Sequence, residues 1–248
     1  MKDLKEKLNN LHSKKFVYLT SDIEWATEEQ ISFFRSYIVS NNLKCTIFIT
    51  HYSNETKKMI EDPAHFEIGI HPNFMKGSSH GTSLKQVIDF FEPVLEIAKG
   101  ARSHGLLNHT SYYNYLCENT NLSYEISTYM PRLEIIQPCK FEYREKVIYK
   151  IPFNWEDDME FTVMEPIWNI KKLASKITGE NLILNFHPIH LFFNNSSQEE
   201  YSISKNIDSK LKPLKKELLK NQKGAFTMLK SIAESNYNCK FVSELLKK

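Results

Sequence analysis

FVYLTSDIEW, residues 16–25, is a run of β-forming apolar residues that ends in two acids. Four later runs also end in reactive side chains: KCTIFITH (44–51), FEIGIHPNF (66–74), ARSHG (101–105) and LILNFHPIH (182–190). The side chains at these ends are Asp22, Glu24, His51, His71, His104 and His187. Parallel strands in a barrel gather their carboxyl ends on one face. We therefore expect an enzyme with one metal-competent site at those ends.

Helical patterns separate the predicted strands. Thr27 with Gln30 and Ser83 with Gln86 match capping boxes, and each precedes an apolar face at helical spacing. Further strands are expected at YEIST, KVIYKIPF and LILNFH. Alternation of strands and helices predicts an α/β fold with a parallel sheet, either an open doubly wound sheet or a closed barrel.

The length of 248 residues, 41% of them hydrophobic, suits one large domain or two small ones. Because no repeat or linker divides the chain, we expect a single domain over residues 1–248. The polar segment 194–223 is expected to be a surface excursion. Leu4, Leu8 and Leu11 lie at helical spacing and predict a short N-terminal helix.

The charge balance argues against nucleic acid as a partner. The chain has 32 Lys and Arg against 30 Asp and Glu, a net charge of +2, which is far from the basic excess that phosphates require. No stretch approaches the ~18 apolar residues of a membrane span, and the N-terminus lacks the apolar core of a signal peptide. The four cysteines form no CxxC pair. We therefore expect a cytoplasmic protein without a membrane span.

Asp22 and Glu24 are two residues apart, so in an extended strand both carboxylates point to the same side. Such a pair can share a metal ion, or one acid can bind it while the other acts as a general base. The structural alternative is a helix-capping acid beside a surface acid. His71 ends a later strand, and imidazole is the commonest side-chain metal ligand, although a loop-capping histidine is the alternative reading. Asn73 offers a further oxygen.

Arg102 in ARSHG and the acids of IPFNWEDD follow neighbouring strands. The acids are Glu156, Asp157 and Asp158. An arginine and an acid at this place either orient a catalytic carboxylate or form a structural ion pair at the barrel mouth. His187 and His190 are three residues apart, so a strand would aim them in different directions. We expect His187, which directly follows the strand, to donate a proton to a departing amine.

Aromatic residues near the strand ends are candidates for a wall against a sugar ring. Trp25, Trp155 and the pair after His190 are of this kind, although most aromatic side chains belong to a core. The sequence contains no Walker A motif, no GxGxxG after a strand, no GxSxG elbow and no HExxH helix. No other catalytic signature therefore competes with the strand-end groups.

Six segments carry a resemblance to a known family: SDIEWA, the TH of IFITH, FEIGIHPNF, RSHGL, IPFNWEDD and NFHPIH. In these segments the sequence resembles the polysaccharide deacetylases of the NodB-homology type, carbohydrate esterase family 4. It is most similar to their WbmS-like branch, which is associated with surface-polysaccharide gene clusters. The resemblance implies a distorted (β/α) barrel and a divalent metal, usually zinc. It places Asp22 at the position of the base, His71 at the first metal histidine, Arg102 at the arginine of the third motif and His187 at the acid.

Two positions depart from the family pattern. Ile23 stands where a second aspartate is usual, so either Glu24 takes the metal role or Asp22 binds the metal itself. Met75 stands where the second metal histidine is usual. The possible substitutes are Asn73, His51, His104 and His80. We favour His104, because it ends a predicted strand.

These observations predict a metal-dependent hydrolase that removes an N-acetyl or similar acyl group from an amino sugar, carried by a nucleotide- or lipid-linked precursor in surface-polysaccharide biosynthesis. The expected catalytic residues are Asp22, Arg102, His187 and Asp158. The expected ligands of Zn²⁺, or another divalent metal, are Asp22, Glu24, His71 and His104. The expected substrate-binding residues are His51, Asn73, Trp155 and His190. The alternatives are an inactive barrel that binds a glycan precursor or partner enzyme, and another metal-dependent hydrolase such as a cyclic amidase.

Overall fold

The computed structural model describes residues 15–206 and 223–247. The helix expected from Leu4, Leu8 and Leu11 lies outside these ranges, as do residues 207–222 of the expected excursion at 194–223. Within the described ranges, no helix has the length and apolar character needed to cross a bilayer.

A sheet of ten strands organises the described residues, and all of its pairings are parallel except the one between β6 and β7. The strands are β1 (Phe16–Asp22), β2 (Cys45–Ile49), β3 (Phe66–Ile70), β4 (Gly100–Ala101), β5 (Tyr124–Tyr129), β6 (Cys139–Tyr143), β7 (Lys146–Phe153), β8 (Trp155–Glu156), β9 (Asn181–Phe186) and β10 (Asn238–Cys239). The order is β6-β7-β5-β4-β3-β2-β1-β9-β8, with β10 on β1. The predicted parallel α/β fold is confirmed.

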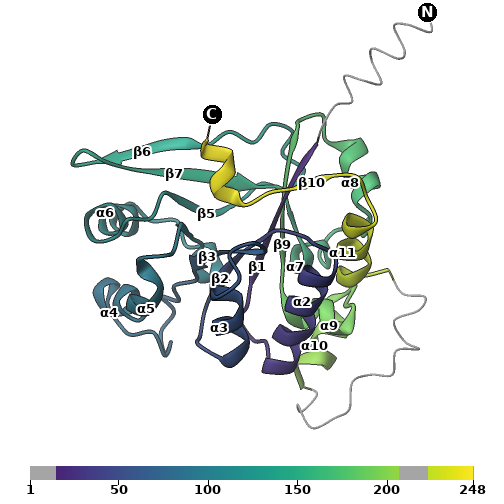
Figure 1. Ribbon diagram of the computed structural model, residues 1–248, viewed down its shortest axis with the longest axis horizontal. Helices are drawn as coiled ribbons and strands as arrows, with labels where there is room; N and C mark the ends of the chain where they lie inside the picture. Colours follow the sequence, from purple (N-terminus) through teal and green to yellow (C-terminus); the bar gives the residue numbers. More distant parts are fainter. Residues whose placement is uncertain (1–14, 207–222, 248) are drawn as a thin grey trace, which may run out of the picture.

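Helices connect and cover the strands (Figure 1). They are α2 (Glu28–Ser40), α3 (Asn54–Ile60), α4 (Leu84–Asp89), α5 (Glu92–Leu95), α6 (Thr110–Asn119), α7 (Asp157–Glu160), α8 (Ile170–Lys176), α9 (Pro188–Phe193), α10 (Gln198–Asn206) and α11 (Ala225–Ala233). Thr27 forms the predicted capping box at α2. Ser83 caps α4, but the Gln86 side chain accepts a hydrogen bond from Thr82 N–H instead of completing a box. The β6–β7 hairpin, which reaches out above α6 in Figure 1, was not predicted.

Asn154 closes the sheet into a distorted barrel. β7 pairs with β5, and after this single residue the chain continues as β8, which pairs with β9. The Asn154 N–H donates to Ile183 O at 3.2 Å, and its side-chain oxygen accepts from the Ile183 N–H at 3.1 Å. Its Nδ2 also donates to Leu133 O at 3.1 Å. Because β9 pairs with β1, the ring of strands is complete, as the family resemblance implied.

Alternate strand residues fill the barrel interior, and the others pack beneath the helices. The interior cluster includes Tyr18, Phe48 and Tyr124. Only glycine fits at position 100, since a Cβ there would lie 2.0 Å from the Tyr124 ring. The C-terminal 3₁₀ helix η3 (Val242–Leu246) plugs the end of the barrel where the strands begin. The strand carboxyl ends are therefore the open end.

Candidate active site

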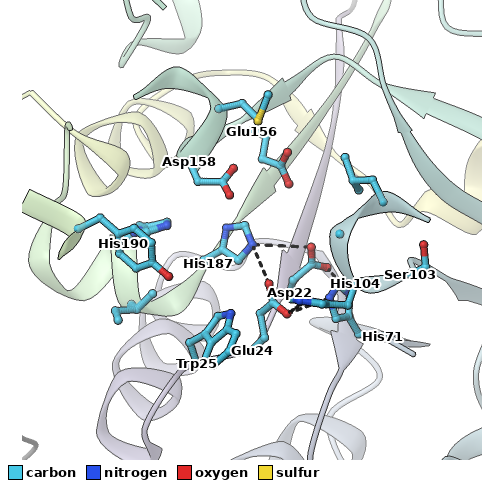
Figure 2. Close-up of a pocket in the computed structure, with 15 residues that line it drawn as sticks. Asp22, Glu24, Trp25, His71, Ser103, His104, Glu156, Asp158, His187 and His190 are labelled. Atoms are coloured by element: carbon cyan, nitrogen blue, oxygen red, sulfur yellow. Dashed lines mark hydrogen bonds and ion pairs between the residues drawn. The ribbon is translucent and has the colours of Figure 1, made fainter. Parts of the chain in front are cut away.

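A pocket of about 380 Å³ opens at the carboxyl ends of the strands (Figure 2). Four carboxylates and four histidines line it: Asp22, Glu24, Glu156, Asp158, His71, His104, His187 and His190. Each follows or ends a strand, because the inward-facing positions of the strands lead to this end of the barrel. The structure thus brings together the strand-end groups that the sequence singled out, with the exception of His51.

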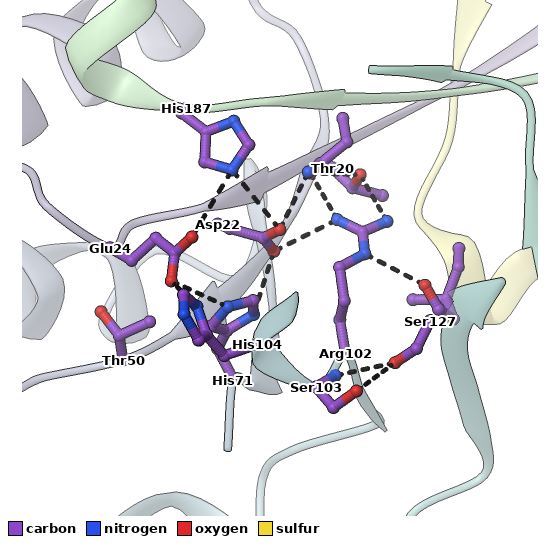
Figure 3. Close-up of polar contacts among 12 residues, drawn as sticks. Thr20, Asp22, Glu24, Thr50, His71, Arg102, Ser103, His104, Ser127 and His187 are labelled. Carbon is purple, nitrogen blue, oxygen red and sulfur yellow. Dashed lines mark hydrogen bonds and ion pairs between the residues drawn. The ribbon is translucent and has the colours of Figure 1, made fainter. Parts of the chain in front are cut away.

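Asp22 is buried and paired with Arg102 (Figure 3). Arg102 Nη1 donates to Asp22 Oδ1 at 3.2 Å. The guanidinium itself is fully buried between the rings of Phe48 and Phe153, 4.6 and 4.5 Å from their centroids. Burial alone favours the neutral acid, but Arg102 and then His71 hold the pKa of Asp22 well below its usual range. Asp22 is therefore ionised, which is the protonation state that a general base requires.

Asn185 connects the Asp22–Arg102 pair to Glu156. Its Nδ2 donates to Asp22 Oδ2 at 2.9 Å and to Glu156 Oε1 at 2.8 Å. Its Oδ1 accepts from Arg102 Nη1 and from Thr20 Oγ1. Both donors and both lone pairs of the amide are thus used, which determines its orientation. Sequence analysis missed Asn185, although a lone amide inside the apolar run LILNF was an available signal.

Glu24, His71 and His104 form a group that can hold a metal ion, with ligand atoms within 4.8 Å of one another. Glu24 Oε2 lies 3.2 Å from His71 Nε2 and also contacts His104 Nδ1. Burial opposes ionisation of Glu24, but hydrogen bonds from His104 and His71 hold its pKa well below the usual range. One carboxylate and two imidazoles are a donor set that suits zinc and leaves coordination positions open. These residues therefore fit the divalent metal that the family resemblance implies.

The structure shows where Ile23 and Met75, the two departures from the family pattern, lie relative to the pocket. Ile23, the first residue after β1, is fully buried in the core, whereas Asp22 and Glu24 on either side of it line the pocket. Met75 is 60% exposed. His104 begins the 3₁₀ turn η1 (His104–Leu106) after β4, and its ring centroid lies 5.7 Å from that of His71. The geometry therefore favours His104 as the second imidazole ligand.

The other proposed substitutes do not line the pocket. His51 Nδ1 lies 2.9 Å from Thr50 Oγ1. Asn73 Oδ1 accepts from Met75 N–H at 2.9 Å. His80 uses both ring nitrogens, since Nδ1 accepts from Asn73 N–H and Nε2 donates to Thr50 O. These side chains hold the loops after β2 and β3, so the structure does not place His51 or Asn73 where the expected substrate contacts would be.

His187 follows β9 directly and is the N-cap of α9. Its Nδ1 is 2.7 Å from Asp157 Oδ1, and its backbone N–H donates to Asp157 Oδ2 at 2.8 Å. Its Nε2 lies 3.8 Å from Asp22 Oδ2 and 3.9 Å from Glu24 Oε1. Burial opposes protonation, but Asp157 raises the pKa of His187 well above its usual value. The partner of His187 is thus Asp157, a residue that the expected catalytic set, with Asp158 as its acid from this segment, did not include.

Glu156 and Asp158 line the pocket above His187 in Figure 2, and side-chain atoms of Glu156, His187 and Asp22 lie within 4.8 Å of one another. Burial and then repulsion from Asp158 raise the pKa of Glu156 to about 8. Burial also raises the pKa of Asp158, whose Oδ1 is buried without a hydrogen-bond partner. This wall of the pocket therefore offers oxygen atoms to a bound molecule.

Trp155, the expected sugar wall, lies in the core and not in the pocket. It is fully buried, its Nε1 donates to Ile167 O at 3.2 Å, and its ring packs against Phe186 and Trp168. In the two-residue strand β8, Glu156 takes the pocket side and Trp155 the opposite side. Alternation across the strand therefore accounts for the difference.

His190 lines the pocket, as expected for a substrate-binding residue. Its Nδ1 is 3.2 Å from Asn195 Nδ2, which identifies Nδ1 as the acceptor. Burial and then the charge of His187 lower the pKa of His190 well below its usual value. His190 is therefore neutral, in contrast to His187.

A family model described as WbmS-like polysaccharide deacetylase matches residues 19–205. The chain belongs to this family. A polysaccharide deacetylase assigned to O-antigen biosynthesis in Bordetella bronchiseptica is 25% identical, with a TM-score of 0.70 over 88% of this chain and 89% of that one. A family 4 acetyl xylan esterase from Clostridium thermocellum, solved with cobalt, is 13% identical, with a TM-score of 0.49 over 94% of this chain and 91% of that one. No curated protein matches.

Proposed function

We propose that this protein is a metal-dependent hydrolase that removes an N-acetyl or similar small acyl group from an amino sugar in surface-polysaccharide biosynthesis. One observation carries the proposal: Asp22 Oδ2 and His187 Nε2 lie 3.8 Å apart beside the group formed by Glu24, His71 and His104. Membership of the WbmS-like family and the similarity to the Bordetella O-antigen protein support the substrate class.

The residues of the chain would divide the reaction as follows. A divalent metal held by Glu24, His71 and His104 would polarise the acyl carbonyl and lower the pKa of water toward ~7. Asp22 accepts the proton that the water loses as its oxygen bonds to the acyl carbon. His187 gives its Nε2 proton to the amide nitrogen as the C–N bond breaks, so that the products are a carboxylic acid and a free amine. Arg102 and Asp157 orient the two groups.

The pocket also bears on the size of the substrate. Its volume of about 380 Å³ lies near the lower end of the roughly 300–1,000 Å³ typical of small-molecule sites. This supports a single sugar unit as the part that enters. The expected carrier is a nucleotide- or lipid-linked precursor.

Acetate release by zinc-loaded and chelator-treated protein tests the proposal. The substrates are N-acetylated amino sugars supplied free, as oligosaccharides and as nucleotide sugars. We expect release that disappears with the chelator and returns with zinc. Chelator-insensitive release would contradict the metal-dependent mechanism. Absence of both release and stoichiometric zinc would instead favour the inactive glycan-binding barrel.

A further inference from the structure

Trp25 is a large aromatic side chain left exposed beside the site. It directly follows Glu24, lines the pocket and is 56% exposed. The other two tryptophans, Trp155 and Trp168, are 0% and 6% exposed. Figure 2 shows the Trp25 ring at the edge of the pocket next to Glu24. The fold therefore buries two of its indole rings and presents the third at the pocket.

The backbone of Trp25 explains how this is achieved. Glu24 and Trp25 follow the end of β1 in a turn, where the alternation of a strand no longer applies, and both line the pocket. The chain turns at Trp25, where φ is +60°, a left-handed conformation that bulky side chains rarely adopt. Strained backbone of this kind persists where it positions a functional group.

Two contacts hold the ring without covering it. Lys205 of α10 lies with its Nζ 4.5 Å from the Trp25 ring centroid. On another side, the His104 ring stands edge-to-face with Trp25 at 6.2 Å. The ring is thus oriented beside a proposed metal ligand while more than half of its surface remains free for a bound molecule.

The charged side chains that line the pocket limit the class of ligand that it can bind. Among the described residues that line it, none is a lysine or arginine, while four are carboxylic acids. Arg102 is fully buried and already bonded to Asp22 and Thr20. His187, the protonated group among the lining residues, is already paired with Asp157 and faces Asp22, so a phosphate on the bound sugar would meet carboxylates without a lysine or arginine to balance it. Sugar hydroxyls, in contrast, can donate to Asp158 Oδ1, which has no hydrogen-bond partner.

We propose, resting on the proposed function, that Trp25 is a stacking platform for a pyranose ring and that the substrate presents an uncharged glycan to the pocket, not a sugar nucleotide. The apolar face of a pyranose packs on an aromatic ring, as other apolar groups do. The carboxyl wall formed by Glu156 and Asp158 accepts hydrogen bonds from the hydroxyls of the same glycan. The expected nucleotide-linked precursor is thereby disfavoured against a free glycan, or a lipid-linked glycan long enough to keep its carrier phosphate away from the bound sugar.

Because Trp25 is the exposed tryptophan, acrylamide quenching of fluorescence reports on it selectively. The measurement uses zinc-loaded Asp22→Asn protein, which retains the pocket but lacks the base. We expect tri-N-acetylchitotriose to protect the quenchable emission and UDP-N-acetylglucosamine at the same concentration not to do so. Trp25→Phe in the same background should have little quenchable emission with or without ligand. Protection by the sugar nucleotide alone, or by neither probe, would overturn the proposal.

Calorimetric titration with the trisaccharide provides a second readout. Trp25→Ala should weaken binding about tenfold, the size of one aromatic contact, while Trp25→Tyr should retain most of the affinity. Equal affinity of Trp25→Ala and the unsubstituted protein would overturn the stacking role. If Trp25→Ala in the otherwise unsubstituted protein releases acetate as fast as the wild type, this inference fails and the proposed function stands. If the trisaccharide protects Trp25 from quenching but the wild-type protein releases no acetate from any substrate, the proposed function fails and the stacking role stands.

Discussion

His187 Nε2 lies 3.8 Å from Asp22 Oδ2, while its Nδ1 is bound to Asp157 Oδ1 at 2.7 Å. The two groups reach this distance from strands that neighbour each other in the barrel but lie far apart in sequence. One is held ionised by Arg102 and the other protonated by Asp157. A proton acceptor and a proton donor thus face the same space in opposite protonation states.

Asp22→Asn should lower kcat for acyl release by about 10²–10⁴-fold, because the isosteric amide keeps the shape of the side chain but cannot act as a base. KM should change little. Steady-state kinetics on the best substrate of the panel would measure both constants. Glu29→Gln, an exposed change in the first turn of α2, is the matched control and should behave as the wild type. Wild-type kcat in Asp22→Asn would rule out this base.

His104→Ala should weaken zinc binding by more than the roughly 10–100-fold typical of an outer-shell partner, because it removes one of three proposed ligands. Zinc titration against a competing chelator measures the affinity directly. His51→Ala deletes a histidine at a neighbouring strand end, outside the pocket, and should leave the affinity unchanged. The reverse ranking of these two variants would assign the ligand to His51.

Arg102→Met should lower the free energy of unfolding by about 3–5 kcal/mol, since it leaves the buried Asp22 carboxylate without its cation. Adding Asp22→Asn should recover part of this loss, with a coupling of about 0.5–3 kcal/mol. Urea unfolding of the two single variants and the double variant measures the coupling. Strictly additive losses would mean that the pair does not act as a unit.

Glu125, fully buried in β5, should make stability depend on pH. Burial raises its pKa to about 7, against hydrogen bonds from Ser127 and Tyr113, while the ordinary value is 4.5. The protonated group therefore contributes its full stability below pH 4.5, and this contribution is lost as the pH rises through about 7. Relative to Glu125→Gln, the wild type should lose about 1–3 kcal/mol between pH 5 and 8 in urea unfolding. A constant difference between the two proteins across that range would contradict the shift.

Short-range sequence patterns were sufficient to predict most of the strands and part of the candidate site. Alternation in an extended strand predicted that Asp22 and Glu24 share a side, and in the structure both line the pocket while Ile23 enters the core, although β1 ends at Asp22 and Glu24 lies in the turn after it. At β8, Trp155 was expected at the sugar wall because it is aromatic, whereas in the structure Glu156 takes the pocket side and Trp155 packs in the core. Periodicity identifies opposite sides of a strand but not which side faces the site.

Contacts between segments far apart in the chain could not be predicted from the sequence. Asp157 is distinguished from Asp158 only by its contact with His187, and Asn185 only by its bonds to Asp22 and Glu156. The barrel also closes through Asn154, whose side chain holds the backbone of Ile183 on another strand. Each of these roles depends on a partner at least 29 residues away.

The sequence by itself determined the succession of strands, the reactive residues at their ends and the family, because each depends on neighbours in the chain or on short motifs. Only the tertiary structure decided which of those residues meet. It placed His104 beside His71 and Glu24, made Asp157 the partner of His187, and turned Trp25 toward the pocket. The physical reason is that closure of the barrel sets the distances across its mouth, and no local pattern encodes those distances.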